Sequence, residues 1–230
     1  MSAERAERVR AERERAEREK RLAAEAAAEL VAGGMTVGLG TGSTVAYLLP
    51  ALARRRQSIR CVASSPRTRQ AAEELGLTVE AFGTLDHLDL TIDGADQIAP
   101  GGWLVKGGGA AYTREKIVAA AATRFVVIAD SRKPVDALHP PIPVELLEFG
   151  LPTTLRRLAP VALRDVPRSP DGGVIADYHG DVGDPARLAA RLAATPGLVE
   201  HGLFPPDLVA EILIGHGDSV EHRTIGGPSR

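Results

Sequence analysis

Short apolar segments alternate with helical patterns over residues 22–129, and this alternation constrains the fold more than any other feature. The apolar segments are Met35–Leu39, Ile59–Ala63, Thr78–Phe82, Leu88–Ile92 and Phe125–Ala129. The helical patterns are Leu22–Ala32, Thr44–Arg56, a segment that starts at Ser65-Pro66, and Tyr112–Ala122. Strands that alternate with helices pair in parallel, because each helix carries the chain back to the start of the next strand. The sequence therefore predicts an α/β fold: a mostly parallel sheet with helices on both faces.

The pattern changes after Pro140-Pro141-Ile142-Pro143. The segments that follow are Val144–Leu147, Leu151–Leu158, Val161–Arg164, Val174–Tyr178, a helix over Pro185–Ala194 and a last strand over Leu198–Phe204. They predict a smaller α+β unit. The strand-like run within Asp207–Gly215 is expected to return to the main sheet. We therefore expect a main domain over residues 20–145 and 206–230 and a smaller domain over residues 146–205.

Residues 1–19 are expected to form a charged helical extension. The stretch from residue 2 to 21 is almost entirely Ala, Glu and Arg, and pairs such as Glu14–Arg18 place opposite charges one helical turn apart. The stretch has no apolar stripe, so we expect it to stay in solvent. A partner-binding helix and an upstream start codon are the alternatives.

Composition excludes several classes of protein. The net charge of −2 gives no reason to expect a nucleic-acid partner. No long apolar run or secretory pattern is present, so no membrane association is expected. Cys61 is the single cysteine, which excludes an intrachain disulfide and fits a cytoplasmic location. The six histidines are scattered without ligand spacing, so no metal site is expected.

Four polar clusters follow predicted strands, at the edge where open parallel sheets bind ligands. The first is Gly38-Leu39-Gly40-Thr41-Gly42-Ser43-Thr44. It would place hydroxyls and bare N–H groups at the start of a helix, which suits a phosphate dianion. It is not a Walker loop, because no lysine precedes Ser43, and its glycine spacing is not that of a dinucleotide site. An ordinary glycine-rich turn is the alternative.

Two further clusters carry charge. Asp93-Gly94-Ala95-Asp96 could bind a metal, hydrogen-bond to sugar hydroxyls or share a proton, and metal is the weakest option. A turn stabilised by aspartate is the alternative. Ala129-Asp130-Ser131-Arg132-Lys133 offers Arg132 and Lys133 as phosphate ligands, with plain surface charge as the alternative.

The remaining cluster, Lys106-Gly107-Gly108-Gly109 followed by Glu115, is the most informative. Successive glycines let backbone N–H groups approach a ligand closely. A cation, an oxyanion-binding turn and a potential base in one short stretch suggest chemistry on an anionic substrate that exchanges protons. A loop before a charged helix is the alternative, which the presence of all four clusters weakens.

In this order, the four clusters resemble the ribose-5-phosphate isomerase family, type A. The resemblance includes Arg114-Glu115-Lys116 and the later Pro196-Gly197-Leu198-Val199 with Gly202-Leu203-Phe204. It implies a Rossmann-like domain with a ferredoxin-like second domain, in a homodimer or homotetramer. It also implies interconversion of D-ribose 5-phosphate and D-ribulose 5-phosphate in the pentose phosphate pathway, without a metal or cofactor.

The resemblance assigns roles as well. Glu115 would be the general base that moves a proton between C2 and C1, and Lys106 with the amides of Gly107, Gly108 and Gly109 would stabilise the enediolate oxygens. Asp93 and Asp96 would handle ring opening and hydroxyl binding. Further contacts to the sugar or its phosphate would come from Thr41, Gly42, Ser43, Thr44, Gly94, Ala95, Lys133 and Lys20.

Three positions depart from the family pattern. Gln97 stands where an acidic residue is common, Arg132 stands where a small residue is common, and Pro50 lies within a predicted helix. Gln97 is expected to alter the coupling of the two aspartates, and Arg132 either to add a phosphate contact or to crowd one.

Two other functions stay open. A related sugar-phosphate isomerase or deaminase should lack the combined lysine, triple glycine and glutamate pattern. A non-catalytic sugar-phosphate sensor would keep the phosphate loop and freely lose Glu115 and Lys106.

Overall fold

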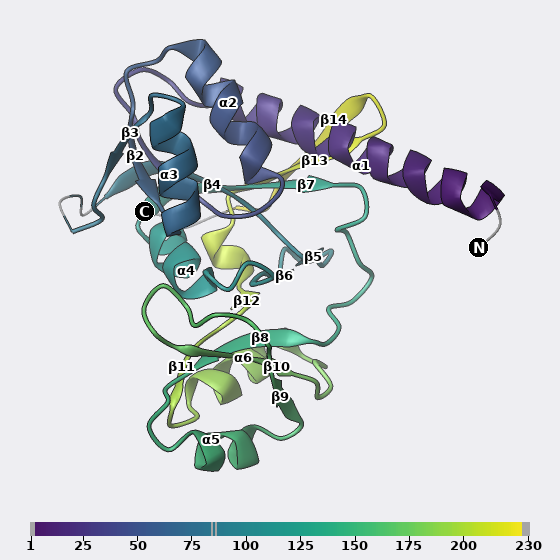
Figure 1. Ribbon diagram of the computed structural model, residues 1–230, viewed down its shortest axis with the longest axis vertical. Coiled ribbons are helices and arrows are strands. Elements are labelled where there is room, and N and C mark those ends of the chain that lie inside the picture. The colour runs from purple at the N-terminus through teal and green to yellow at the C-terminus, as the bar shows by residue number, and fades with distance from the viewer. Residues whose placement is uncertain (1–2, 84, 86, 227–230) are drawn as a thin grey trace.

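A seven-stranded sheet forms the centre of the molecule in the computed structural model, which describes residues 3–83, 85 and 87–226 (Figure 1). Its strands, in spatial order, are β14 (Ser219–Thr224), β13 (Glu211–His216), β7 (Ala122–Asp130), β4 (Leu88–Gly94), β1 (Thr36–Leu39), β2 (Arg60–Ala63) and β3 (Thr78–Glu80). Every neighbouring pair is parallel except β13 with β14. The mostly parallel sheet is therefore confirmed, and β13 returns to it as expected.

Helices cover both faces of this sheet. Buried residues of α1 (Ala3–Glu29), α2 (Val45–Arg55) and α3 (Pro66–Glu74) share one core with β1, β4 and β7. On the other face, α4 (Tyr112–Ala120) packs Tyr112 and Ala119 against Phe125 and Val127 of β7. None of the described helices is long and apolar enough to cross a membrane.

A smaller antiparallel sheet with two helices lies below the main sheet in Figure 1. It comprises β8 (Ile142–Leu146), α5 (Leu151–Leu158), β9 (Val161–Leu163), β10 (Val174–Tyr178), α6 (Pro185–Ala193) and β11 (Leu198–His201). The chain order is βαββαβ and the spatial order is β11-β8-β10-β9, which is the ferredoxin-like arrangement.

A small third sheet lies between the main sheet and the smaller sheet (Figure 1), and one of its strands differs from expectation. It contains β5 (Gln97–Ile98), β6 (Leu104–Val105) and β12 (Leu203–Phe204), followed by a 3₁₀ turn over Pro206–Leu208. The single strand expected over 198–204 is split at Gly202, whose N–H donates to Pro143 and whose carbonyl accepts from Lys106. Any Cβ at Gly202 would lie 2.1 Å from the Lys106 carbonyl oxygen, so the crossing between sheets requires glycine.

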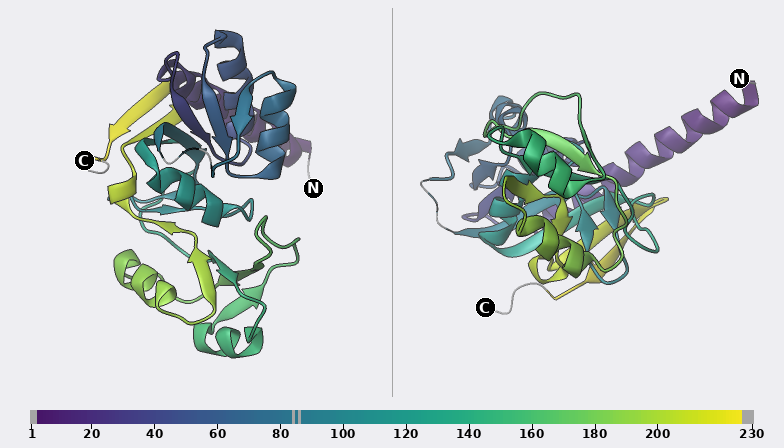
Figure 2. Two further views of the ribbon diagram at one scale, coloured as in Figure 1. Left: turned by 90° about the vertical axis from the view of Figure 1, so that its left-hand side faces the viewer. Right: turned by 90° about the horizontal axis from the view of Figure 1, so that it is seen from below.

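The N-terminal helix also differs from expectation. The helix expected to begin at Leu22 is one continuous α1, whose N-terminal part projects beyond the body (Figure 2). Packing already begins at Ala16, and Glu19 is buried. The Glu19 carboxylate accepts hydrogen bonds from Ser131 and from the Gly217 N–H, so a charged residue anchors the part of α1 before Leu22, which has no apolar stripe.

Candidate active site

The candidate site lies where the strand order reverses. From β1 the chain proceeds through β2 to β3 on one side, and β4 then pairs with the other side of β1. The carboxyl ends of β1 and β4 meet at this switch point, which is where open α/β sheets bind ligands. A cavity of about 300 Å³ opens there, lined by Thr41, Gly42, Ser43, Thr44, Gly94, Ala95, Asp96, Lys106, Gly107, Gly108, Gly109, Glu115 and Lys133. Of the residues proposed for catalysis or substrate binding, Asp93, Lys20 and Arg132 are not in this lining.

Three buried ionisable side chains form the base of the site. The Lys106 ammonium lies 2.8 Å from Asp93 Oδ2 and 3.2 Å from Glu115 Oε2, and it donates to the Gly94 carbonyl at 2.5 Å. Asp93, Lys106 and Glu115 are each at most 4% exposed. One cation therefore lies between two carboxyl groups that have little contact with water, so their interactions are poorly screened.

Burial shifts the acid–base properties of the three groups. It raises the pKa of Glu115 to about 8, with the negative charge of Asp93 acting in the same direction and Lys106 opposing. Burial also raises the pKa of Asp93, against the opposing effect of Lys106. For Lys106, burial alone would lower the pKa, but Asp93 and Glu115 together raise it above its ordinary value. Lys106 therefore stays charged, and Glu115 becomes a carboxyl that exchanges its proton near neutral pH.

Asp93 is fixed by its surroundings and does not line the cavity. Oδ1 accepts hydrogen bonds from the N–H groups of Thr41 and Gly94, at 3.0 and 2.7 Å, while Oδ2 pairs with Lys106. A Cβ at Gly40 would lie 1.9 Å from this carboxylate, so only glycine lets the β1 turn approach it. Asp93 also lies within β4 rather than in the turn that the sequence allowed, because the strand continues through Gly94. We infer that Asp93 acts through Lys106 and Glu115.

The glycine turn forms one wall of the cavity. Gly107 has a φ of +122°, and a Cβ there would lie 2.6 Å from the Tyr112 ring and 2.8 Å from Pro143. The Gly108 N–H donates to Asp96 at 2.9 Å. In the described part of the chain, the Gly109 N–H has no hydrogen-bond partner, so it is available to an oxyanion.

The opposite wall is the N-terminus of α2. Within the described residues, the N–H groups of Gly42, Ser43 and Thr44 donate no hydrogen bond to the protein. Free N–H groups at a helix N-terminus attract a phosphate dianion, and the Lys133 side chain lines the same cavity. The Thr41 hydroxyl is engaged elsewhere, in a cluster with the hydroxyls of Ser64, Ser65 and Thr68.

Lys20 and the three departing residues have structural partners away from this cavity. Lys20 pairs with Glu17 at 2.8 Å. The Gln97 amide bonds to the backbone of His139 at both ends, so its role is to hold β5 against a loop. Arg132 folds back onto Asp130 at 2.7 Å and neither adds nor crowds a cavity contact. Pro50 lies within α2, which continues to Arg55.

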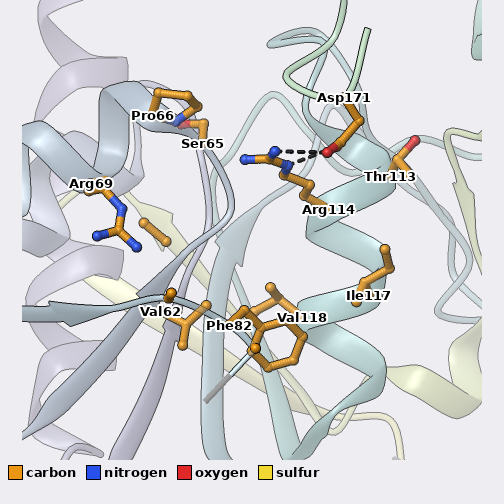
Figure 3. Close-up of a pocket in the computed structure, with 13 residues that line it drawn as sticks. Val62, Ser65, Pro66, Arg69, Phe82, Thr113, Arg114, Ile117, Val118 and Asp171 are labelled. Atoms are coloured by element: carbon orange, nitrogen blue, oxygen red, sulfur yellow. Dashed lines mark hydrogen bonds and ion pairs between the residues drawn. The ribbon is translucent and has the colours of Figure 1, made fainter. Parts of the chain in front are cut away.

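A second, larger cavity lies on another side of α4 and has different chemistry. It measures about 500 Å³, with Val62, Phe82, Ile117 and Val118 as its apolar wall (Figure 3). The Arg114 side chain at its rim is already paired with Asp171. We place the reaction in the smaller cavity because that one contains the buried lysine and glutamate.

Sequence reasoning missed the supports that come from distant segments. The Phe204 ring of β12 lies under both Lys106 and Lys116, whose ammonium groups are 5.4 and 4.9 Å from the ring centroid. Arg164, which follows β9, donates to the Gly107 carbonyl. No local pattern marks either contact, because each joins segments that are far apart in the chain. Among the described residues, no group of three or more His, Cys, Asp or Glu side chains could hold a metal ion.

Known proteins share this fold and sequence over most of the chain. Residues 60–219 match the family described as ribose 5-phosphate isomerase A (phosphoriboisomerase A). The ribose-5-phosphate isomerase A of a Caulobacter species is 46% identical over 216 residues, which cover 87% of this chain and 95% of that relative.

Two solved structures extend the comparison. The ribose 5 phosphate isomerase A of Neisseria gonorrhoeae superposes with a TM-score of 0.85 at 31% identity, covering 89% of this chain and 95% of that one. A D-ribose-5-phosphate isomerase in complex with phospho-erythronic acid superposes with a TM-score of 0.84 at 31% identity, and the match covers 89% of this chain and 97% of that one. The likeness is therefore not confined to single motifs.

Proposed function

The chain belongs to the ribose 5-phosphate isomerase A family, and from that premise we propose how its residues perform the family's reaction. The protein interconverts D-ribose 5-phosphate and D-ribulose 5-phosphate in the pentose phosphate pathway. The observation that carries the mechanism is the buried Lys106 between Asp93 and Glu115, next to the Gly109 N–H of the glycine turn, which has no partner among the described residues.

We assign the proton transfer to Glu115. Its carboxylate takes the proton from C2 of the open-chain aldose and returns it to C1, while the hydroxyl proton passes from O2 to O1. The charge that develops on the enediolate oxygens is stabilised by the Lys106 ammonium and by the N–H groups of the glycine turn. A base of this kind works best when its pKa lies near the working pH, which burial provides here.

The remaining groups bind the rest of the sugar phosphate. We assign the phosphate to the α2 N-terminus, from Gly42 to Thr44, together with Lys133. Asp96 is exposed at the cavity wall and is our candidate for ring opening and hydroxyl binding. Asp93 contributes by holding Lys106 in place.

An isomerase assay with excess chelator tests the proposed reaction. We expect ribose 5-phosphate to be converted to ribulose 5-phosphate at an undiminished rate after incubation with the chelator, because Lys106 and the amides supply the electrophile. The control is the same assay after dialysis and addition of magnesium or zinc. Loss of activity with the chelator, restored by metal, would contradict the metal-free mechanism. Absence of isomerisation under all conditions would leave the sensor as the better account.

The pH profile of kcat/KM tests the assignment of the base. Glu115 must be ionised to accept a proton, and its ionised fraction falls below its pKa of about 8. We therefore expect kcat/KM to fall about tenfold per pH unit on the acidic side. The pH profile of a variant with a substitution far from the site is the control, because a loss of activity caused by unfolding at low pH would appear in both proteins. A rate that stays constant between about pH 6 and pH 8 would contradict a base with this pKa.

The assembly of the protein, its location in the cell and its domain boundaries are the last parts of the proposal. We propose a homodimer or homotetramer in the cytoplasm, with Cys61 buried and reduced. For the domains we propose the bounds expected from the sequence: an extension over residues 1–19, a main domain over 20–145 and 206–230, and a smaller domain over 146–205. The one change is that residues 142–145 join the smaller domain, because β8 belongs to its sheet. Residues 1–2, 84, 86 and 227–230 lie outside the described chain. Size-exclusion chromatography with light scattering measures the assembly directly.

A further inference from the structure

Arg164 connects the smaller sheet to the glycine turn of the active site. Its guanidinium donates two hydrogen bonds to the carboxylate of Asp177 on β10. Nε donates to Oδ2 at 3.0 Å, and Nη2 donates to Oδ1. The remaining Nη1 donates to the Gly107 carbonyl at 2.8 Å. Both side chains of the pair are less than one-fifth exposed, so this arginine is held in one orientation with a donor directed at the turn.

The bond fixes a single peptide group of the turn from both sides. The carbonyl of the Gly107–Gly108 peptide accepts from Arg164, and from the Ala110 N–H at 3.1 Å. The N–H of the same peptide points the opposite way, because a trans peptide group is planar, and it donates to Asp96 in the cavity wall. Arg164 therefore determines which face of this peptide the substrate meets.

The orientation matters because a glycine pair does not maintain it by itself. With no Cβ on either side, this peptide can rotate with little steric resistance. Rotation by half a turn would direct the carbonyl oxygen into the cavity where an N–H now points. A carbonyl oxygen there would repel both the developing enediolate and the Asp96 carboxylate, whereas the N–H in its present place donates to Asp96 and causes no such repulsion.

We propose that Arg164 is a positioning residue that holds the Gly107–Gly108 peptide in the orientation that keeps its carbonyl oxygen away from the developing enediolate. The inference rests on the proposed function, since it concerns the charge that forms in that reaction. Arg164 itself touches no reacting atom; it acts through the backbone of the turn.

Replacing Arg164 by methionine tests the proposal. We expect kcat to fall about 10²-fold, the loss that a misplacement of about 1 Å at a reacting centre produces. KM should change little, because the phosphate subsite from Gly42 to Thr44 is untouched. The affinity for phospho-erythronic acid, whose carboxylate presents two oxygens as the enediolate does, should fall along with kcat. The affinity for inorganic phosphate should stay at the wild-type value.

Two matched variants separate positioning from stability. Arg124→Met removes a similar arginine–carboxylate pair, to Glu211, at the opposite edge of the sheet, and should keep wild-type kinetics. Arg164→Lys keeps a cation for Asp177 without the planar fork, so its kcat should lie between those of wild type and Arg164→Met. Thermal unfolding shows whether each variant is folded. If Arg164→Met is not folded, the kcat of Arg164→Lys alone tests the proposal.

A wild-type kcat in a folded Arg164→Met or Arg164→Lys protein would overturn the inference. Equal losses of phospho-erythronic acid and inorganic phosphate affinity would also overturn it, because they would indicate a general disturbance of the cavity. Neither result would affect the proposed function, which fails only if the wild-type protein does not isomerise ribose 5-phosphate.

Discussion

Replacing Glu115 by glutamine should reduce kcat by roughly 10³- to 10⁴-fold, because it removes the group to which we assign the proton transfer between C2 and C1. Glutamine has the same shape and can still accept a hydrogen bond from Lys106, so the cavity should persist. We expect inorganic phosphate to bind with wild-type affinity. Release of deuterium from C2-labelled ribose 5-phosphate measures the proton-transfer step directly and should fall by the same factor as kcat.

Glu211→Gln is the matched control for this experiment. Glu211 is a mostly buried glutamate on β13, paired with Arg124 at the opposite edge of the sheet. The same chemical change there should leave kcat unaltered. If Glu115→Gln kept substantial turnover and deuterium release, Glu115 would lose its assignment as the base, and another carboxyl group, Asp96 first, would have to be considered.

Replacing Lys106 by methionine should be the second most damaging change, with effects on both rate and stability. The variant loses the cation to which we assign stabilisation of the enediolate, and we expect this loss to lower kcat by about 10²- to 10³-fold. It also leaves the carboxyl groups of Asp93 and Glu115 buried without a counter-ion. Removing one partner of a buried ion pair typically costs about 3 kcal/mol or more in the free energy of unfolding.

The stability loss should depend on pH in a defined direction. Without Lys106 the folded-state pKa values of Asp93 and Glu115 rise further above their unfolded values, because the lysine charge now opposes that rise. The folded variant then binds more protons than the unfolded chain, so its free energy of unfolding decreases as pH increases. We expect a small deficit near pH 5 and a larger one near pH 8 in urea titrations. An equal deficit at both values would contradict this electrostatic account.

Lys116→Met separates the two effects. Lys116 is also largely buried, lies over the same Phe204 ring and pairs with Glu200 at 2.6 Å, but it does not line the cavity. Its loss should lower stability while kcat changes far less than in Lys106→Met. Equal losses of kcat in the two variants would indicate that the fall comes from disturbed packing around Phe204.

The sequence by itself determined the architecture and the placement of the candidate residues. The period of the apolar residues and the length of each segment separated strands from helices. The strand β10 was predicted with its observed bounds, Val174–Tyr178. The polar clusters were expected to converge because parallel strands end at one edge of a sheet, and the cavity gathers residues from all four. That reason holds for three of them; the Lys106 cluster instead follows β6 of the small antiparallel sheet. Turns and strand ends are local features, so local sequence encodes them.

The tertiary structure alone decided how these residues interact. The pKa of Glu115 depends on burial and on the charge of Asp93, which lies 22 positions away (115 − 93). The split at Gly202 and the bond from Arg164 to Gly107 likewise arise where separate segments meet. Desolvation and charge pairing depend on the distance in space between groups, whereas a sequence pattern reports only their distance along the chain. The sequence therefore displays the groups proposed for catalysis, but their acidity and orientation are set only by the contacts that the folded chain makes around Lys106.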